Sequence, residues 1–101
     1  MFIYNITTHV AHSIKEVWLD WMEKKHIPEI MQKECFVKYQ ICKVLEIDET
    51  EGVTYAIQFY AESKAQYNRY IEMYATALRE DAVRCWGNKT IGFRSLMELI
   101  S

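Results

Sequence analysis

The histidine at position 26 is the strongest candidate for acid–base chemistry in this chain. It lies two residues before Pro28, the only proline, where a predicted helix has to break. A side chain at such a break can point into a cleft, and a neutral imidazole there can accept or donate a proton near pH 7. The alternative is structural, because a histidine at a helix end often hydrogen-bonds the last carbonyls of that helix. The sequence leaves both interpretations open.

The other histidines and the cysteines are weaker candidates. His9 and His12 form an H-x-x-H pair, but they lie at a predicted strand-to-helix junction without the third ligand that zinc needs. The three cysteines include no C-x-x-C pair and have no activating base beside them. We therefore expect no metal site, no disulfide within the chain and no catalytic cysteine. The chain also lacks G-x-G-x-x-G and P-loop patterns, so we expect no nucleotide and no other cofactor.

Aromatic residues on two predicted helices form a candidate ligand site. Trp18 and Trp21 lie on the first predicted helix, and Tyr67 and Tyr70 lie on the long predicted helix that begins at residue 63. Most such residues pack in a core, but buried tyrosine hydroxyls need partners, and an aromatic pocket with a few polar groups suits a small planar ligand. The candidate ligand-binding residues are therefore Trp18, Trp21, His26, Tyr67 and Tyr70.

Periodicity predicts the elements of the first half of the chain. Residues 2–10 are rich in β-branched and aromatic types and predict a strand. Apolar residues at helical spacing over 14–22 predict an amphipathic helix, with an S-x-x-E capping box at 13–16. The proline then predicts a short second helix over about 28–33.

Three further strands and one long helix are predicted in the second half. In order, they are the strand 35–47, the strand 53–61, the helix from 63 to about 86 and the strand 90–100. An acidic hairpin loop joins the first two of these strands, and in it Gly52 is expected to supply a positive φ angle. The long helix starts with an S-x-x-Q capping box at Ser63, and Gly87 ends it.

The element order predicts the fold class. The order β-α-β-β-α-β is typical of the α+β, ferredoxin-like plan, a four-stranded antiparallel sheet with both main helices on one face. At 101 residues, half of them hydrophobic, a single domain over residues 1–101 can build its core without metals or disulfides.

The sheet face turned away from the helices is predicted to be of mixed polarity. On the parity taken to point outward, the strands carry Phe36, Lys38, Gln40, Cys42, Val44, Ala56, Gln58, Tyr60, Arg94, Leu96, Glu98 and Ile100. A sheet face of this kind is more often a subunit interface than bare solvent surface. We therefore predict a homodimer formed through this face.

Charge and hydropathy argue against several classes of partner. The net charge of −2 comes from 12 basic and 14 acidic residues with no block of one sign, so we expect neither nucleic acid nor an anionic membrane as a partner. No apolar run is long enough for a transmembrane helix, and the first residues lack the features of a signal peptide. The expected location is the cytoplasm.

Several motifs resemble a known family. The motifs are Ile3-Tyr4-Asn5-Ile6-Thr7, Trp18-x-x-Trp21-Met22-x-x-x-His26-Ile27-Pro28-Glu29, Tyr67-x-x-Tyr70 and Phe93-Arg94. Over nearly the whole chain they resemble a family of short bacterial proteins catalogued only as a domain of unknown function. More distantly, the chain is similar to the dimeric α/β-barrel superfamily of ferredoxin-like proteins. This resemblance implies two subunits packed sheet to sheet and, in some members, a histidine in a cleft near the end of the first helix.

Three hypotheses for function follow. The first is a homodimer that binds a small apolar or aromatic molecule between sheet and helices, beside His26. The second is a cofactor-independent enzyme of the small monooxygenase or isomerase type, with His26 as acid or base; the distant superfamily includes such enzymes as well as proteins without established activity. The third is a structural or regulatory dimer without a pocket. An open cavity with His26 in its wall favours the first two, a filled core favours the third, and we prefer the non-enzymatic first.

Overall fold

The protein is a four-stranded sheet covered on one side by helices. The computed structural model describes all residues from 1 to 101. In chain order the elements are β1 (Phe2–Ala11), α1 (Lys15–Trp21), the π-turn η1 (Met22–His26), α2 (Ile27–Met31), β2 (Lys38–Lys43), β3 (Gly52–Ala61), α3 (Lys64–Met73), α4 (Ala75–Trp86), the 3₁₀ turn η2 (Gly87–Lys89) and β4 (Thr90–Glu98). The strands pair antiparallel in the order β2-β3-β1-β4. The predicted α+β class and element order are confirmed.

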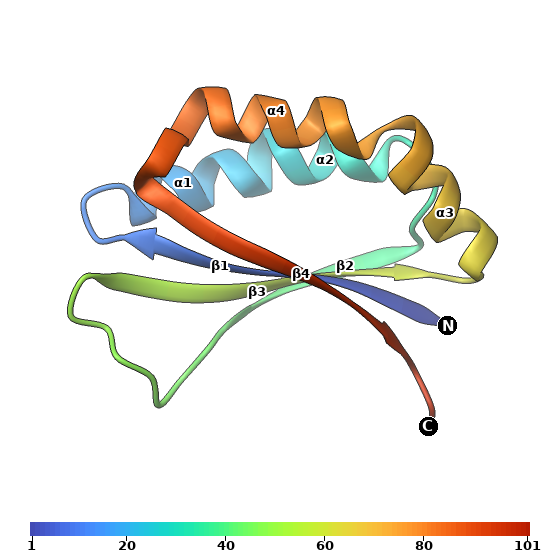
Figure 1. Cartoon of the computed structure of the whole chain (residues 1–101), viewed down its shortest axis with the longest axis horizontal. Coiled ribbons are helices and arrows are strands. Elements are labelled where there is room, and N and C mark those ends of the chain that lie inside the picture. Colours follow the sequence, from blue (N-terminus) through green and yellow to red (C-terminus); the bar gives the residue numbers. More distant parts are fainter.

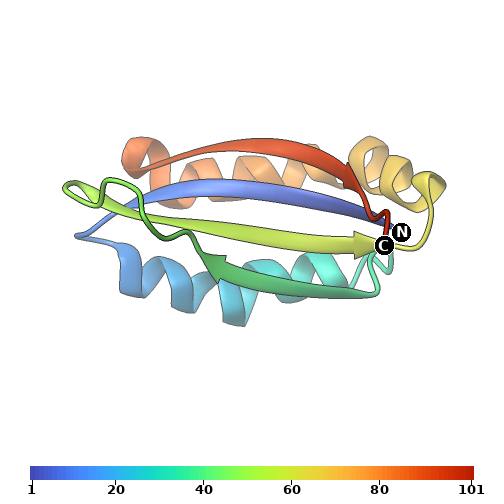
Figure 2. The same cartoon turned by 90° about the horizontal axis from the view of Figure 1, so that it is seen from below.

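The helices form one layer above the sheet (Figure 1). Seen from below, α1 to α2 run behind β3 and β2, and α4 runs behind β4 (Figure 2). No helix covers the opposite face, which we call the open face. The β2–β3 loop and the C-terminal residues both bend toward the open side (Figure 1). Each helix is too short or too polar to cross a bilayer.

The core fills much of the space between sheet and helices and is centred on aromatic contacts. The ring of Tyr4 on β1 lies 5.7 to 6.3 Å from the rings of Phe36, Phe59, Tyr67 and Tyr70, measured between centroids. Fully burying one such large side chain contributes about 1.5–3 kcal/mol to folding. This cluster fixes α3 on the sheet and closes one end of the space between the layers.

The first helical segment contains a π-turn that the sequence did not predict. The N–H of Ile27 donates to the carbonyl of Met22, five residues earlier. In an unbroken α-helix, at 100° per residue, Ile27 and Ile30 would rotate away from the face that buries Trp18 and Met22. The extra residue of the π-turn returns them to that face, where all four are buried. The break expected at the proline is therefore wrong, because the chain stays helical from 15 to 31.

The helix ends follow the predictions only in part. The cap predicted at Ser63 is confirmed, since Ser63 Oγ accepts a hydrogen bond from the N–H of Gln66 at 3.2 Å, but the Gln66 side chain accepts from Arg69 instead of closing the box. The capping box at Ser13 is wrong, because Ile14 is the N-cap and no side chain caps α1. The predicted long helix is divided at Tyr74, whose backbone leaves the helical region with φ −127°. Gly87 ends α4 with φ 56°, as expected.

Gly52 is needed for a reason other than its φ angle. Only Gly87, Glu34 and Glu46 have positive φ, so the expected role of Gly52 in the hairpin is wrong. Gly52 is instead the first residue of β3, where a Cβ atom would lie 2.2 Å from the carbonyl oxygen of Val10. The loop before it spans 44–51, because β2 ends at Lys43 and is shorter than predicted.

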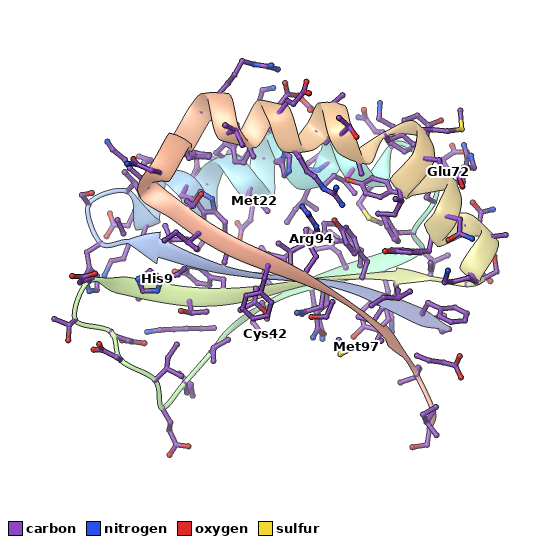
Figure 3. All side chains as sticks on the ribbon, in the orientation of Figure 1. His9, Met22, Cys42, Glu72, Arg94 and Met97 are labelled. Carbon is purple, nitrogen blue, oxygen red and sulfur yellow. The ribbon has the colours of Figure 1, made fainter.

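The outward parity predicted for the last strand is wrong. Arg94 pairs with Ile6 and Leu96 pairs with Tyr4, so both lie on the helix side of β4. Figure 3 shows Arg94 above the sheet, between it and the helices, and Met97 below it. The residues of β4 on the open face are Ile91, Phe93, Ser95 and Met97. Apolar residues occupy both faces of this edge strand, so alternation alone could not assign its parity. Phe36, also predicted outward, is buried in the core.

Candidate functional site

A cavity of about 250 Å³ lies between the sheet and the helices. Its walls come from β1, β3 and β4 below and from α1, η1, α2, α3 and α4 above. Twelve of its nineteen lining residues are hydrophobic. All three tryptophans of the protein, Trp18, Trp21 and Trp86, line it. A concave, mainly apolar site with a few polar groups is the usual form of a small-molecule site.

The structure brings four of the five predicted ligand-binding residues to this cavity. They are Trp18, Trp21, His26 and Tyr70. Tyr67 is absent from the cavity wall; its ring packs on Tyr4 at 5.7 Å, and Lys64 Nζ lies 5.4 Å from its centroid. The two tyrosines, three residues apart on α3, therefore point into different parts of the layer. Whether the four lining residues contact a ligand stays a prediction.

His26 is held in the cavity wall by the π-turn. Its ring stacks on Trp21 with centroids 4.5 Å apart and planes inclined by 18°. Residues five apart do not share a face of an α-helix, whereas the i to i+5 hydrogen bonding of a π-turn sets them one above the other. The residue is 8% exposed, less than sequence reasoning expected, because the helix continues past it into α2.

The electrostatic setting of His26 keeps its ring neutral. Burial lowers the pKa of His26, although the carboxylates of Glu29 and Asp81 oppose this and Lys25 adds to it. Its Nδ1 atom is buried and has no hydrogen-bond partner. Neither ring nitrogen has a partner within the chain, and a neutral imidazole can bind a ligand by a hydrogen bond or exchange a proton with it.

Two arginines that the sequence did not select also line the cavity. Arg79 lies on the predicted long helix and was not a candidate residue, and Arg94 was predicted to lie on the outward sheet face. In the structure Arg79 Nη2 donates a hydrogen bond to Tyr4 Oη at 3.1 Å, and Arg94 points to the helix side of β4. Arg79 lies between Ala75 and Ala82 at helical spacing, at the edge of the buried stripe, and this position was the available signal.

The Tyr70 hydroxyl is buried in the same cavity wall as the two arginines. Burial raises the pKa of Tyr70 well above its ordinary value, and Arg79 and Arg94 oppose that rise. The two arginines, from α4 and β4, both line the cavity. A further donor, Trp86 Nε1, is buried there without a partner, and its indole ring meets Trp21 edge-on at 5.7 Å.

The remaining candidate residues lie apart from the cavity. His9 Nδ1 bonds the hydroxyl of Thr54 at 3.1 Å, and His12 Nε2 bonds the carbonyl of Glu49 at 2.7 Å. No three His, Cys, Asp or Glu side chains converge in a way that would hold a metal ion. The three thiols are free, and Cys35 alone is buried, where its pKa is raised.

The fold is shared with structures of dimeric ferredoxin-like proteins and their relatives. One such protein, from an uncultured marine organism, matches with a TM-score of 0.75 and 13% identity over 99% of this chain and 95% of its own. A protein of the ethyl tert-butyl ether degradation (EthD) family from Bacillus halodurans C-125 matches with a TM-score of 0.65 and 13% identity, over 99% and 100%. SnoaB, a cofactor-independent oxygenase from Streptomyces nogalater, matches with a TM-score of 0.62 and 9% identity, over 99% and 94%. At these identities the likeness concerns the fold alone.

The sequence also identifies the family of the chain. The family model described as a domain of unknown function, DUF4286, matches residues 1–100. The chain belongs to this family. A comparison with curated proteins found no match.

Proposed function

We propose that the protein binds a small apolar or aromatic molecule in the cavity between sheet and helices. The observation that carries this proposal is the 250 Å³ cavity lined by Trp18, Trp21 and Trp86. Well-packed cores contain few voids larger than a water molecule, so a space of this size beside free polar atoms favours an occupant. The third hypothesis, a dimer without a pocket, requires a filled core and does not agree with it.

The test uses the tryptophans as reporters. Binding of 2-naphthol is expected to shift the indole N–H resonances of all three tryptophans in NMR spectra. Ala82 lines the cavity and Ala77 is exposed on the same helix, so Ala82→Phe fills the space and Ala77→Phe is its control. We expect Ala82→Phe to abolish the 2-naphthol shifts and Ala77→Phe to retain them. Shifts that survive Ala82→Phe unchanged would place the binding elsewhere and contradict the proposal.

A cofactor-independent enzyme is the second candidate, and one feature favours it. Burial lowers the pKa of His26, so its ring is neutral near pH 7 and lies in the cavity wall. Such a group can remove a proton from a bound substrate. If the protein is an enzyme, His26→Gln removes turnover and retains ligand binding. If it is a binding protein, the same change alters affinity alone.

We further propose that the protein acts as a homodimer that packs through the open face. Ile91 and Phe93 on that face are 72% and 66% exposed. The polar side chains there are already paired with one another, since Gln40 Nε2 donates to Gln58 Oε1 at 2.7 Å and to Tyr60 Oη at 3.0 Å. Dimeric relatives of the same fold support the proposal. The free thiols favour a reducing compartment such as the cytoplasm.

A further inference from the structure

The cavity carries positive charge that no acidic side chain neutralises. Arg79 and Arg94 both line it, and its nineteen lining residues include no Asp or Glu. The four ion pairs of the protein use neither arginine. Arg94 is exposed and Arg79 is half-buried, and guanidinium groups without a counter-charge are available to bind an anion. The arrangement therefore suits a ligand that brings the negative charge itself.

The unpaired hydrogen-bonding atoms favour the same ligand chemistry. Four buried side-chain polar atoms in the protein lack a partner, and three of them belong to cavity residues: His26 Nδ1, Arg79 Nε and Trp86 Nε1. Guanidinium and indole N–H groups donate hydrogen bonds and cannot accept them. These three atoms are buried in the wall, so an occupant meets the outer guanidinium groups of Arg79 and Arg94, and a carboxylate presents two acceptor oxygens in a geometry that matches the guanidinium fork.

The apolar and cationic parts of the cavity come from different elements. Trp18, Met22 and Ile30 contribute apolar surface from the first helical segment, whereas the arginines come from α4 and β4. The volume of about 250 Å³ exceeds the roughly 150 Å³ in which benzene binds inside a protein. One ring with a short substituent therefore fits.

We propose that the ligand is a small organic carboxylate whose ring-sized apolar body packs against Trp18 and Met22 and whose carboxylate binds Arg79 and Arg94. This inference rests on the proposed function and narrows it from small apolar molecules in general to those that carry one negative charge.

The experiment compares matched charged and neutral probes by the indole N–H shifts. The pairs are benzoate with benzamide and 2-naphthoate with 2-naphthamide; inorganic phosphate serves as an anion without an apolar body. Each carboxylate is expected to bind at least about tenfold more tightly than its amide, because hydrogen bonds to charged groups are the stronger ones. Phosphate is expected to bind more weakly than benzoate, since it leaves the apolar wall unused.

Two variants assign the charge preference to a residue. Arg94 makes no hydrogen bond or ion pair within the chain, so Arg94→Met is expected to fold normally and to lower benzoate affinity about tenfold while changing that of benzamide less than about twofold. Arg84 pairs with Asp81 at the surface of α4, so Arg84→Met removes the same charge away from the cavity and should leave both affinities unchanged.

The outcomes separate this inference from the proposed function. If amides bind as tightly as carboxylates, or if the preference survives Arg94→Met and Arg79→Met alike, the cavity binds apolar molecules and the carboxylate proposal is wrong. Phosphate that binds as tightly as benzoate contradicts the ring-sized body. If none of the ring compounds shifts the indole resonances, the proposed function itself fails.

Discussion

The titration of His26 makes the stability of the folded protein depend on pH. In the unfolded chain its pKa is near the ordinary value of 6.5, and burial lowers it in the folded protein. Between these two pKa values the unfolded state binds a proton that the folded state does not. The contribution of His26 to stability is therefore fully present above pH 6.5 and is lost as the pH falls through its folded-state pKa.

Replacing His26 by a ring that cannot titrate isolates this effect. His26→Phe keeps a planar ring against Trp21 and retains Glu29, Asp81 and Lys25, the charged groups that act on position 26. In denaturant melts between pH 7 and pH 5, we expect wild type to lose free energy of unfolding relative to the variant as the pH falls. His9 and His12 are present in both proteins, so their titration cancels. A difference that stays constant over this range would show that His26 has the same pKa in the folded and unfolded states.

Single residues were predictable where their type fixes their position. Trp18 and Trp21 could be assigned to the helix–sheet layer because large aromatic residues at helical spacing are buried. Arg79 and Arg94 could not be assigned in this way. An arginine can pack its aliphatic stem on apolar surface, whereas a hydrophobic pattern places every charged residue on the exposed face. The apolar half of the site could therefore be predicted, and its cationic half could not.

At the scale of elements, the π-turn η1 both sets His26 against Trp21 in the cavity wall and keeps the apolar residues of α2 in the core. It rotates α2 so that Ile27 and Ile30 are buried on the same side as Trp18. Periodicity analysis assumes 3.6 residues per turn and cannot register one extra residue, so the sequence predicted a break instead. The strands were predictable from composition and alternation, except on the edge strand β4, where both faces carry apolar residues.

Deleting Lys24 from the π-turn tests its role. Removal of one residue converts the turn to regular α-helix and leaves the buried faces of α1 and α2 in place, so the loss of stability is expected to stay near the value of an exposed ion pair, about 1 kcal/mol or less. Trp21 and His26 then lie four residues apart and still share a face of the α-helix, so binding of 2-naphthol or benzoate should change little in the NMR titration.

Deletion of Thr76 from the regular helix α4 is the matched control. Thr76 is exposed like Lys24, but its removal turns Leu78 away from the core and should cost at least about 3 kcal/mol in a denaturant melt. Equal losses of stability from the two deletions would contradict the interpretation that η1 contains one residue more than a regular α-helix needs.

At the scale of the whole molecule, the open face is a sheet surface that no helix covers and that carries exposed apolar side chains. The correction to β4 makes it more apolar than the sequence suggested, because Phe93 and Ile91 replace Arg94 and Leu96 there. The β2–β3 loop and the C-terminal residues flank it on the same side (Figure 1) and add the exposed side chains of Leu45 and Ile100. The molecule measures 38 by 31 Å along its longer axes, enough for the roughly 800 Å² per partner of a specific interface.

The last prediction is that a charge on this face separates the subunits. We expect light scattering of wild type at tens of micromolar to give twice the mass of one chain. Phe93→Asp places a carboxylate among the exposed apolar side chains of the open face and should weaken association at least about 30-fold, the loss typical of an interface hot-spot residue. Val17 on α1 is similarly exposed, at 59% against 66%, but lies on the helix layer, so Val17→Asp should remain dimeric. Neither side chain is in the core, and circular dichroism should show both variants folded. A monomeric wild type, or a Phe93→Asp variant with undiminished mass, would mean that the open face meets solvent or a different protein.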